Sequence, residues 1–141
     1  MCSMCQDLPE YKKYLIKKYK YWRVELYSNQ SYLGRCVIIL NRHLEDFFDI
    51  THDELNELYA ITKKLRDAIK SSFHPDLFNY ASLGNDTRHV HLHVVPRYSR
   101  IVTFHGHKFE DKKWGYNYSG YDKTFKLSDD LIHIIIREIQ I

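Results

Sequence analysis

The stretch from residue 89 to residue 95 alternates histidine with aliphatic residues, in the order His89-Val90-His91-Leu92-His93-Val94-Val95. A period of two is typical of a β-strand with one buried face, so the three histidines are predicted to share the other face. Near neutral pH an imidazole can act as a nucleophile, a proton carrier or a metal ligand. The regularity of the row favours a site of chemistry over three surface histidines with ordinary hydrogen bonds.

Two kinds of chemistry fit this row. A catalytic zinc needs three protein ligands, but strand residues i and i+4 lie about 13 Å apart, so one ion cannot bind all three histidines. Covalent catalysis at phosphorus needs a nucleophilic nitrogen, a proton donor and hydrogen-bond donors for the charged oxygens. We expect His91 and His93 to supply the first two, and Asn85 and Arg97 to lie nearby.

A second group of candidate ligands stands at the start of the chain, where Cys2 and Cys5 form a Cys-x-x-Cys pair. The spacing suits two ligands of one zinc ion, although a redox pair and an incidental pair remain open. Cys36 lies in an apolar run and is predicted to be a small core residue. Because three cysteines cannot all pair within one chain, a reducing compartment is expected.

The composition limits the class of protein. The chain has 141 residues, 44% of them hydrophobic and 28% charged, which predicts one globular domain spanning 1–141. A formal net charge of +3 suits an anionic small ligand without requiring nucleic acid. No apolar run has the length of a membrane span, and the first residues lack the apolar region of a signal peptide. We therefore expect a soluble, cytoplasmic protein without a membrane partner.

The rest of the chain predicts the elements that position these residues. Strands are expected at 22–27, 36–40, 77–84 and 89–95, with Pro96 ending the last. Helices are expected at 8–20, from a Thr51 capping box to Phe73, and from Ser128 to about Glu138. The first helix is basic, so it could dock RNA or a membrane surface, but packing on the sheet edge is favoured. In the glycine- and aromatic-rich stretch 98–127, the side chains that either close over a ligand or pack a dimer interface are His105, His107 and Trp114.

Residues 89–95 resemble the signature of the histidine triad (HIT) family, in which histidine alternates with hydrophobic residues. The surrounding order also matches: Gly34 with the apolar strand to Leu40, Arg42-His43, a long helix, Leu83-Gly84-Asn85, the triad and Pro96-Arg97. The resemblance covers 1–100 as the core and extends more loosely over the C-terminal loop and helix at 101–141. It implies an α+β, HIT-like fold: an antiparallel sheet of about five strands, a long central helix and shorter N- and C-terminal helices.

The resemblance also implies an activity. HIT proteins hydrolyse or transfer nucleotidyl groups at the α-phosphate of dinucleoside polyphosphates or nucleoside phosphoramidates, usually as homodimers. His91 would be the nucleophile that forms a nucleotidyl-histidine, and His93 would contact the phosphate and assist proton transfer. The expected partner is a purine nucleotide or dinucleotide. The alternatives are a nucleotide-binding regulatory or scaffold protein with little catalysis, and a nucleic-acid-processing protein that docks through its basic helix.

Some HIT proteins bind structural zinc through a Cys-x-x-Cys pair, a histidine after the central strand and the first triad histidine. The matching residues here are Cys2, Cys5, His43 and His89.

The remaining expected substrate contacts are Asn85, Thr87, Arg97 and Arg35. Asn85 would lie near the phosphates or ribose, and Thr87 would stand in for a Ser or Gln over the leaving group. Arg35 occupies a position where many members have histidine. Its charge either meets a phosphate or points away, so substrate preference is not carried over.

Overall fold

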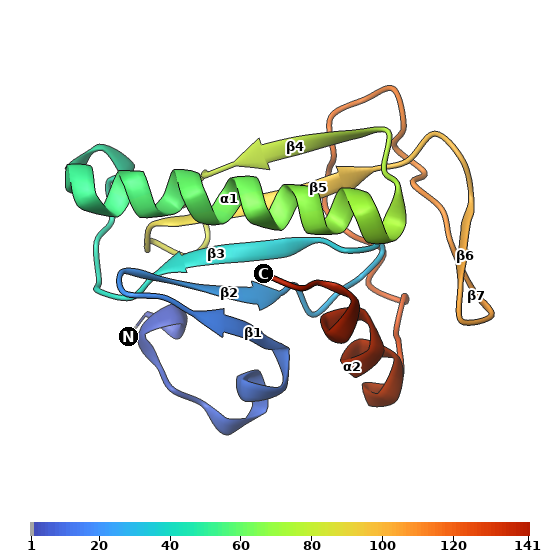
Figure 1. Cartoon of the computed structure of the whole chain (residues 1–141), viewed down its shortest axis with the longest axis horizontal. Helices are drawn as coiled ribbons and strands as arrows, with labels where there is room; N and C mark the ends of the chain where they lie inside the picture. The colour runs from blue at the N-terminus through green and yellow to red at the C-terminus, as the bar shows by residue number, and fades with distance from the viewer. Residues whose placement is uncertain (1) are drawn as a thin grey trace.

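A five-stranded antiparallel sheet forms the centre of the computed structural model, which describes residues 2–141 (Figure 1). The strand order is β1-β2-β3-β5-β4. The strands span Leu15–Lys18 (β1), Trp22–Leu26 (β2), Cys36–Leu40 (β3), Leu77–Ala81 (β4) and His91–Arg97 (β5). The predicted α+β class, the number of strands and the antiparallel pairing are confirmed.

Helix α1, His52–Phe73, covers one face of this sheet (Figure 1). The predicted capping box is present: Thr51 Oγ1 accepts from Glu54 N, and Glu54 Oε1 accepts from Thr51 N. The buried stripe of the helix consists of Glu54, Leu58, Ile61, Leu65, Ile69 and Phe73. It packs on the β2 side chains Trp22, Val24 and Leu26, which are almost fully buried.

The N-terminal helix expected at 8–20 is not formed. Residues Pro9–Tyr14 make a short 3-10 helix, and Leu15–Lys18 pairs with β2 as the edge strand β1. A helix with few buried contacts is only marginally stable, because its stability in a protein comes mostly from packing. A strand here gains backbone hydrogen bonds to β2, and this pairing outweighs the helical spacing of the apolar residues. An earlier 3-10 turn, Ser3–Cys5, carries the cysteine pair.

Strand β5 begins and ends later than predicted. His89 precedes the strand, and Pro96 lies inside it, opposite Phe78 of β4. The last pair that β5 makes with β3 is Val94 with Cys36, so beyond Val94 the β3 side of β5 is open. A proline is tolerated there because no β3 partner needs its missing N–H.

The C-terminal part contributes side chains to the same core as the sheet and α1. Helix α2, Asp129–Glu138, begins at Ser128, whose Oγ accepts from Leu131 N as predicted. Its Ile132 and Ile135 join the core cluster, as does Phe109 of a β6–β7 hairpin, Val102–Phe104 with His107–Phe109, that was not predicted. The single domain expected over 1–141, with its core at 1–100 and a C-terminal loop and helix at 101–141, stays a prediction.

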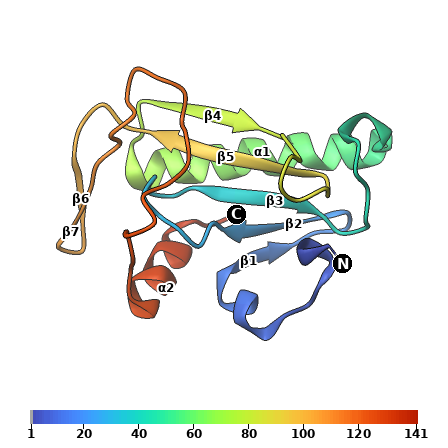
Figure 2. The same cartoon turned by 180° about the vertical axis from the view of Figure 1, so that it is seen from behind.

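The segment between β7 and α2 crosses the sheet on the face opposite α1 (Figure 2). His105 and His107 lie in the β6–β7 hairpin, which projects beyond the sheet (Figure 1). Among residues 2–141, no helix combines the length and apolarity that crossing a bilayer requires.

Candidate active site and metal cluster

The face of the sheet opposite α1 carries the two histidines expected to be catalytic. Pairing with β3 sets His91 opposite Ile39 and His93 opposite Val37, while Leu92 and Val94 point to the helix side. His91 is 6% exposed, and the two rings meet edge to face with centroids 5.0 Å apart. The alternation predicted from the sequence therefore brings His91 and His93 together.

One contact fixes the tautomer of His91. Its Nδ1 lies 2.5 Å from the carbonyl oxygen of His89. A carbonyl can only accept a hydrogen bond, so Nδ1 carries the proton and Nε2 keeps its lone pair. The backbone thus orients the imidazole so that Nε2 is the nitrogen without a protein partner, which is the arrangement that a nucleophile needs.

The neighbouring ring, His93, has the opposite arrangement. Arg35 Nη2 lies 3.3 Å from His93 Nδ1, and a guanidinium can only donate, so Nδ1 accepts. The proton of neutral His93 is then on Nε2. Burial first, and then the charge of Arg35, lower the pKa of His93 to about 3. His93 therefore offers a hydrogen-bond donor at Nε2 and has no free lone pair at Nδ1 for the expected proton transfer.

Arg35 itself is buried between aromatic rings. Its Cζ atom lies 4.0 Å from the ring centroid of Tyr27 and 5.2 Å from that of Tyr118. The backbone before it is constrained, because Gly34 has φ +85° and a Cβ there would lie 3.2 Å from the Phe73 side chain. Only glycine allows this close turn over α1, and the turn directs Arg35 onto the histidine face.

At the start of β5, two thiols and two imidazoles converge. His89 Nδ1 lies 3.3 Å from Cys2 Sγ, 3.4 Å from Cys5 Sγ and 3.3 Å from His43 Nδ1. All four donor atoms lie within 4.8 Å of one another. The predicted cluster is therefore assembled, and it could hold a metal ion.

The orientation of His89 also suits a ligand. Its Nε2 lies 2.7 Å from the Leu40 carbonyl and must donate to it, so the lone pair of Nδ1 faces the cluster. Such a second hydrogen bond is the usual way in which proteins hold a metal-ligating imidazole. The N-terminal loop is held as well, because Arg23 Nη2 donates to the Met4 carbonyl at 2.8 Å.

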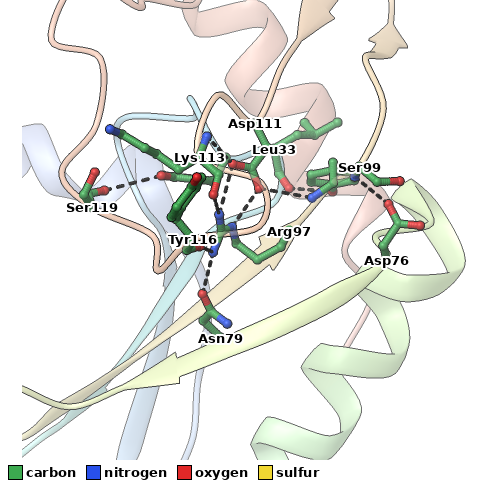
Figure 3. Close-up of polar contacts among 11 residues, drawn as sticks. Leu33, Asp76, Asn79, Arg97, Ser99, Asp111, Lys113, Tyr116 and Ser119 are labelled. Atoms are coloured by element: carbon green, nitrogen blue, oxygen red, sulfur yellow. Dashed lines mark hydrogen bonds and ion pairs between the residues drawn. The ribbon is translucent and has the colours of Figure 1, made fainter.

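At the other end of β5, Arg97 anchors the segment that follows β7 (Figure 3). Its five N–H groups all donate within the protein: two to the Asp111 carboxylate and one each to Asn79 Oδ1, Lys113 O and Tyr116 O. The Arg97 and Asp111 side chains are 3% and 0% exposed. No donor remains for a substrate, so we assign Arg97 to positioning in place of the substrate contact that the sequence suggested.

The loop before the triad holds the last two predicted contacts. Asn85 is exposed and Thr87 is half-buried. Within residues 2–141 neither side chain forms a hydrogen bond to the protein, and the Thr87 carbonyl accepts from His89 N at 3.0 Å. Both side chains are thus available to a ligand at the His89 end of the triad.

Sequence reasoning missed the aromatic residues around the site. Tyr27 contacts His93 edge to face, at 5.6 Å between centroids, and Tyr121 packs on Tyr27 at 5.7 Å. Tyr118 packs on Tyr32 at 6.2 Å. A high tyrosine content was visible in the sequence, but nothing in the spacing assigned residues 118 and 121 to the neighbourhood of residue 27.

The chain matches the model of the HIT domain over residues 10–100. An AP-4-A phosphorylase of Mycobacterium tuberculosis is 31% identical over 77 residues, which are 50% of this chain and 40% of that protein. The fold is similar to that of a histidine triad protein from Sinorhizobium meliloti, with a TM-score of 0.76, 15% identity and coverage of 99% and 97% of the two chains. It is also similar to that of a Zn-bound histidine triad family protein from Mycobacterium smegmatis, with a TM-score of 0.58, 21% identity and coverage of 88% and 84%.

The family model covers well over half of the chain, and it includes β1 to β5, α1 and the whole histidine row. The fold and the paired histidines agree with that match. The chain therefore belongs to the histidine triad family.

Proposed function

We propose that the protein hydrolyses or transfers nucleotidyl groups by attack of His91 Nε2 on the α-phosphorus of a nucleotide conjugate. The candidate substrates are dinucleoside polyphosphates and nucleoside phosphoramidates. The relative named AP-4-A phosphorylase supports a nucleotide anhydride as substrate, although this chain spans less than half of that protein.

The observation that carries the proposal is the hydrogen bond from His91 Nδ1 to the His89 carbonyl. It holds the imidazole in the tautomer whose Nε2 is free, with His93 Nε2–H beside it to donate to a phosphoryl oxygen. In the first step the Nε2 lone pair bonds to phosphorus and the leaving group departs. In the second step water adds to phosphorus, the N–P bond breaks, its electrons return to Nε2, and a water proton goes to solvent.

We propose zinc as the ion of the Cys2, Cys5, His43 and His89 cluster. A tetrahedral zinc with usual Zn–N and Zn–S bonds places its donor atoms about 3.3–3.8 Å apart. The contacts between nitrogen and sulfur or nitrogen and nitrogen are 3.3–3.4 Å. The Zn-bound relative from M. smegmatis supports the same choice of metal.

With all four ligands from the protein, the ion would be structural and would fix the backbone that leads into His91. Thiolate ligands persist under reducing conditions, which supports a cytoplasmic location.

We propose that two copies of the chain associate along β4. Strand β4 is at the edge of the sheet and, among the residues that the structure describes, pairs only with β5. Its Leu77 and Tyr80 are exposed, as is Leu83 just beyond it. An exposed apolar edge strand is a template for pairing with another chain. Sedimentation of the wild type and of Leu77→Lys tests this: the wild type should be a dimer and the variant a monomer.

The function is tested by replacing the nucleophile. His91→Asn should lower turnover of diadenosine tetraphosphate and of an adenylyl amine by at least about 10³-fold, because covalent catalysis is lost. The matched control is His133→Asn, which changes an exposed histidine of α2 and should leave turnover unchanged. Equal turnover by His91→Asn and wild type would exclude the proposed nucleophile. Tight mononucleotide binding without turnover would instead favour a binding protein.

A further inference from the structure

Arg35 is a buried cation without a counter-ion. It is 4% exposed, and its Nε and Nη1 are buried with no hydrogen-bond partner. Within residues 2–141 no carboxylate forms an ion pair with it. Tyr27 and Tyr118 offset part of the charge through their ring faces, but ring faces do not satisfy N–H donors.

Such an arrangement is costly unless a ligand completes it. A buried charged group with unsatisfied donors is among the most unfavourable features in a folded protein. An oxyanion beside His93 would supply the missing charge and a missing acceptor, since guanidinium N–H groups donate charge-assisted hydrogen bonds to phosphoryl oxygens. The covering rings, Tyr118 and Tyr121, belong to a segment without helix or strand, so their displacement would expose Arg35.

Arg35 also determines what His93 can do. The guanidinium is always charged and can only donate, so His93 Nδ1 is held as an acceptor at 3.3 Å. Burial first, and then the charge of Arg35, lower the pKa of His93, so the ring stays neutral and cannot hand a proton from an imidazolium to a departing atom. It can still donate a hydrogen bond from Nε2 to an oxygen that already carries charge.

The two candidate substrate classes differ in this requirement. When His91 Nε2 attacks an anhydride, the bond from phosphorus to the bridging oxygen breaks. Its electron pair leaves on that oxygen as a phosphate anion, so no proton is needed. When it attacks a phosphoramidate, the electron pair leaves on nitrogen, which must gain a proton as it departs. A fixed cation favours the first case and weakens the second.

We infer that Arg35 makes this site select phosphoric anhydrides, whose leaving group is an anion, over phosphoramidates, whose leaving group is an amine. The inference rests on the proposed function and decides between its two substrate classes. It assigns to Arg35 Nε and Nη1 the binding of phosphoryl oxygens, and to Nη2 the positioning of His93.

The test compares kcat/KM for diadenosine tetraphosphate and for adenosine 5′-phosphoramidate in four proteins. The wild type should prefer the anhydride by about 100-fold or more, since a well-placed charge contributes about 10²–10³-fold. Arg35→His should reduce that preference at least about 10-fold, whereas Arg35→Lys, which keeps the charge, should retain the anhydride preference. The matched control, Arg100→His, changes an exposed arginine and should leave the preference as in the wild type.

A second readout does not depend on turnover. The ¹⁵N shifts of His93 should report a neutral ring protonated at Nε2 down to pH 5 in the wild type. In Arg35→His the pKa of His93 should rise, because the charge that is the second cause of its lowering is removed. A wild type that prefers the phosphoramidate, with turnover still abolished by His91→Asn, overturns this inference alone. So does an Arg35→His variant that folds and loses both activities equally. If the wild type turns over neither substrate, the proposed function and this inference fall together.

Discussion

The two ends of β5 are both fastened to distant parts of the chain, but by different chemistry. At its start, Cys2 and Cys5 meet His43 and His89 in a half-exposed cluster of metal-ligand side chains. At its end, Arg97 and Asp111 form a fully buried ion pair whose donors are all satisfied. The first attachment is a set of side chains that could hold a metal ion, whereas the second is complete within the protein. His91 and His93 lie between them.

In the proposed mechanism, positioning and chemistry are separated along one strand. The outer residues, His89 and Arg97, have every hydrogen-bonding atom directed to protein or to the metal cluster. The inner ones keep an atom free: His91 Nε2 as a lone pair and His93 Nε2–H as a donor. This arrangement agrees with the proposed function, in which the ends of the strand position the histidines and the middle of the strand reacts.

The largest expected effect comes from breaking the buried end. Arg97→Leu leaves the Asp111 carboxylate buried without its partner, which costs about 3–5 kcal/mol of unfolding free energy. Urea unfolding measures this loss, and the double variant with Asp111→Leu should recover part of it. Arg100→Leu breaks an exposed pair with Asp76 and should cost under about 1 kcal/mol. An Arg97→Leu protein as stable as the wild type would show that the Arg97–Asp111 pair does not stabilise this end of β5.

The metal end should give a smaller loss that depends on free zinc. Metal analysis should find about one zinc per chain, and Cys5→Ser should bind much less. A strong chelator should destabilise the wild type by about 2–4 kcal/mol, since a ligand that binds only the folded state contributes by mass action. The same chelator should not change the unfolding free energy of Cys5→Ser, and it should not change the loss of stability caused by Arg97→Leu. Wild-type protein that is metal-free and insensitive to chelator would refute the proposed zinc.

A pH-dependent loss should appear beside the metal end, at the start of α1. Hydrogen bonds from Arg42 lower the pKa of Glu54 from 4.5 to about 2. Because the folded pKa is the lower one, the stabilisation is present above pH 4.5 and disappears as the pH falls towards 2. In metal-stripped protein this should amount to about 1–2 kcal/mol, because Arg42 is half-exposed. In Glu54→Gln the unfolding free energy should fall less between pH 4.5 and pH 2 than in the wild type. An equal fall in both proteins would contradict this prediction.

The sequence predicted most elements because their signals are local. The alternation at residues 89–95, the Thr51 capping box and the apolar run of β3 each specify an element without reference to distant residues. The same locality explains the error at 8–20, where helical spacing was outweighed by pairing with β2. The strand end predicted at Pro96 is wrong for a related reason. Whether a strand tolerates a proline depends on whether a neighbouring strand needs its N–H, and here β3 does not reach Pro96.

The site was predictable only in part. Strand geometry excluded one ion bound by all three histidines, and the family resemblance supplied the cluster that the structure assembles. The Arg97–Asp111 pair joins residues 14 positions apart around a hairpin, and the rings around Arg35 come from residues 27 and 118. No periodicity links such positions, so the Arg97 role and the environment of Arg35 required the fold.

The most direct test of the central claim locates the covalent intermediate. The protein is mixed with diadenosine tetraphosphate, quenched in denaturant within milliseconds, digested and fragmented in a mass spectrometer. We predict a nucleotidyl group on His91, absent from His91→Asn and still formed, more slowly, by His93→Asn. A nucleotidyl group on His89 or His93, or steady turnover with no adduct on the protein, would contradict the division of roles along β5.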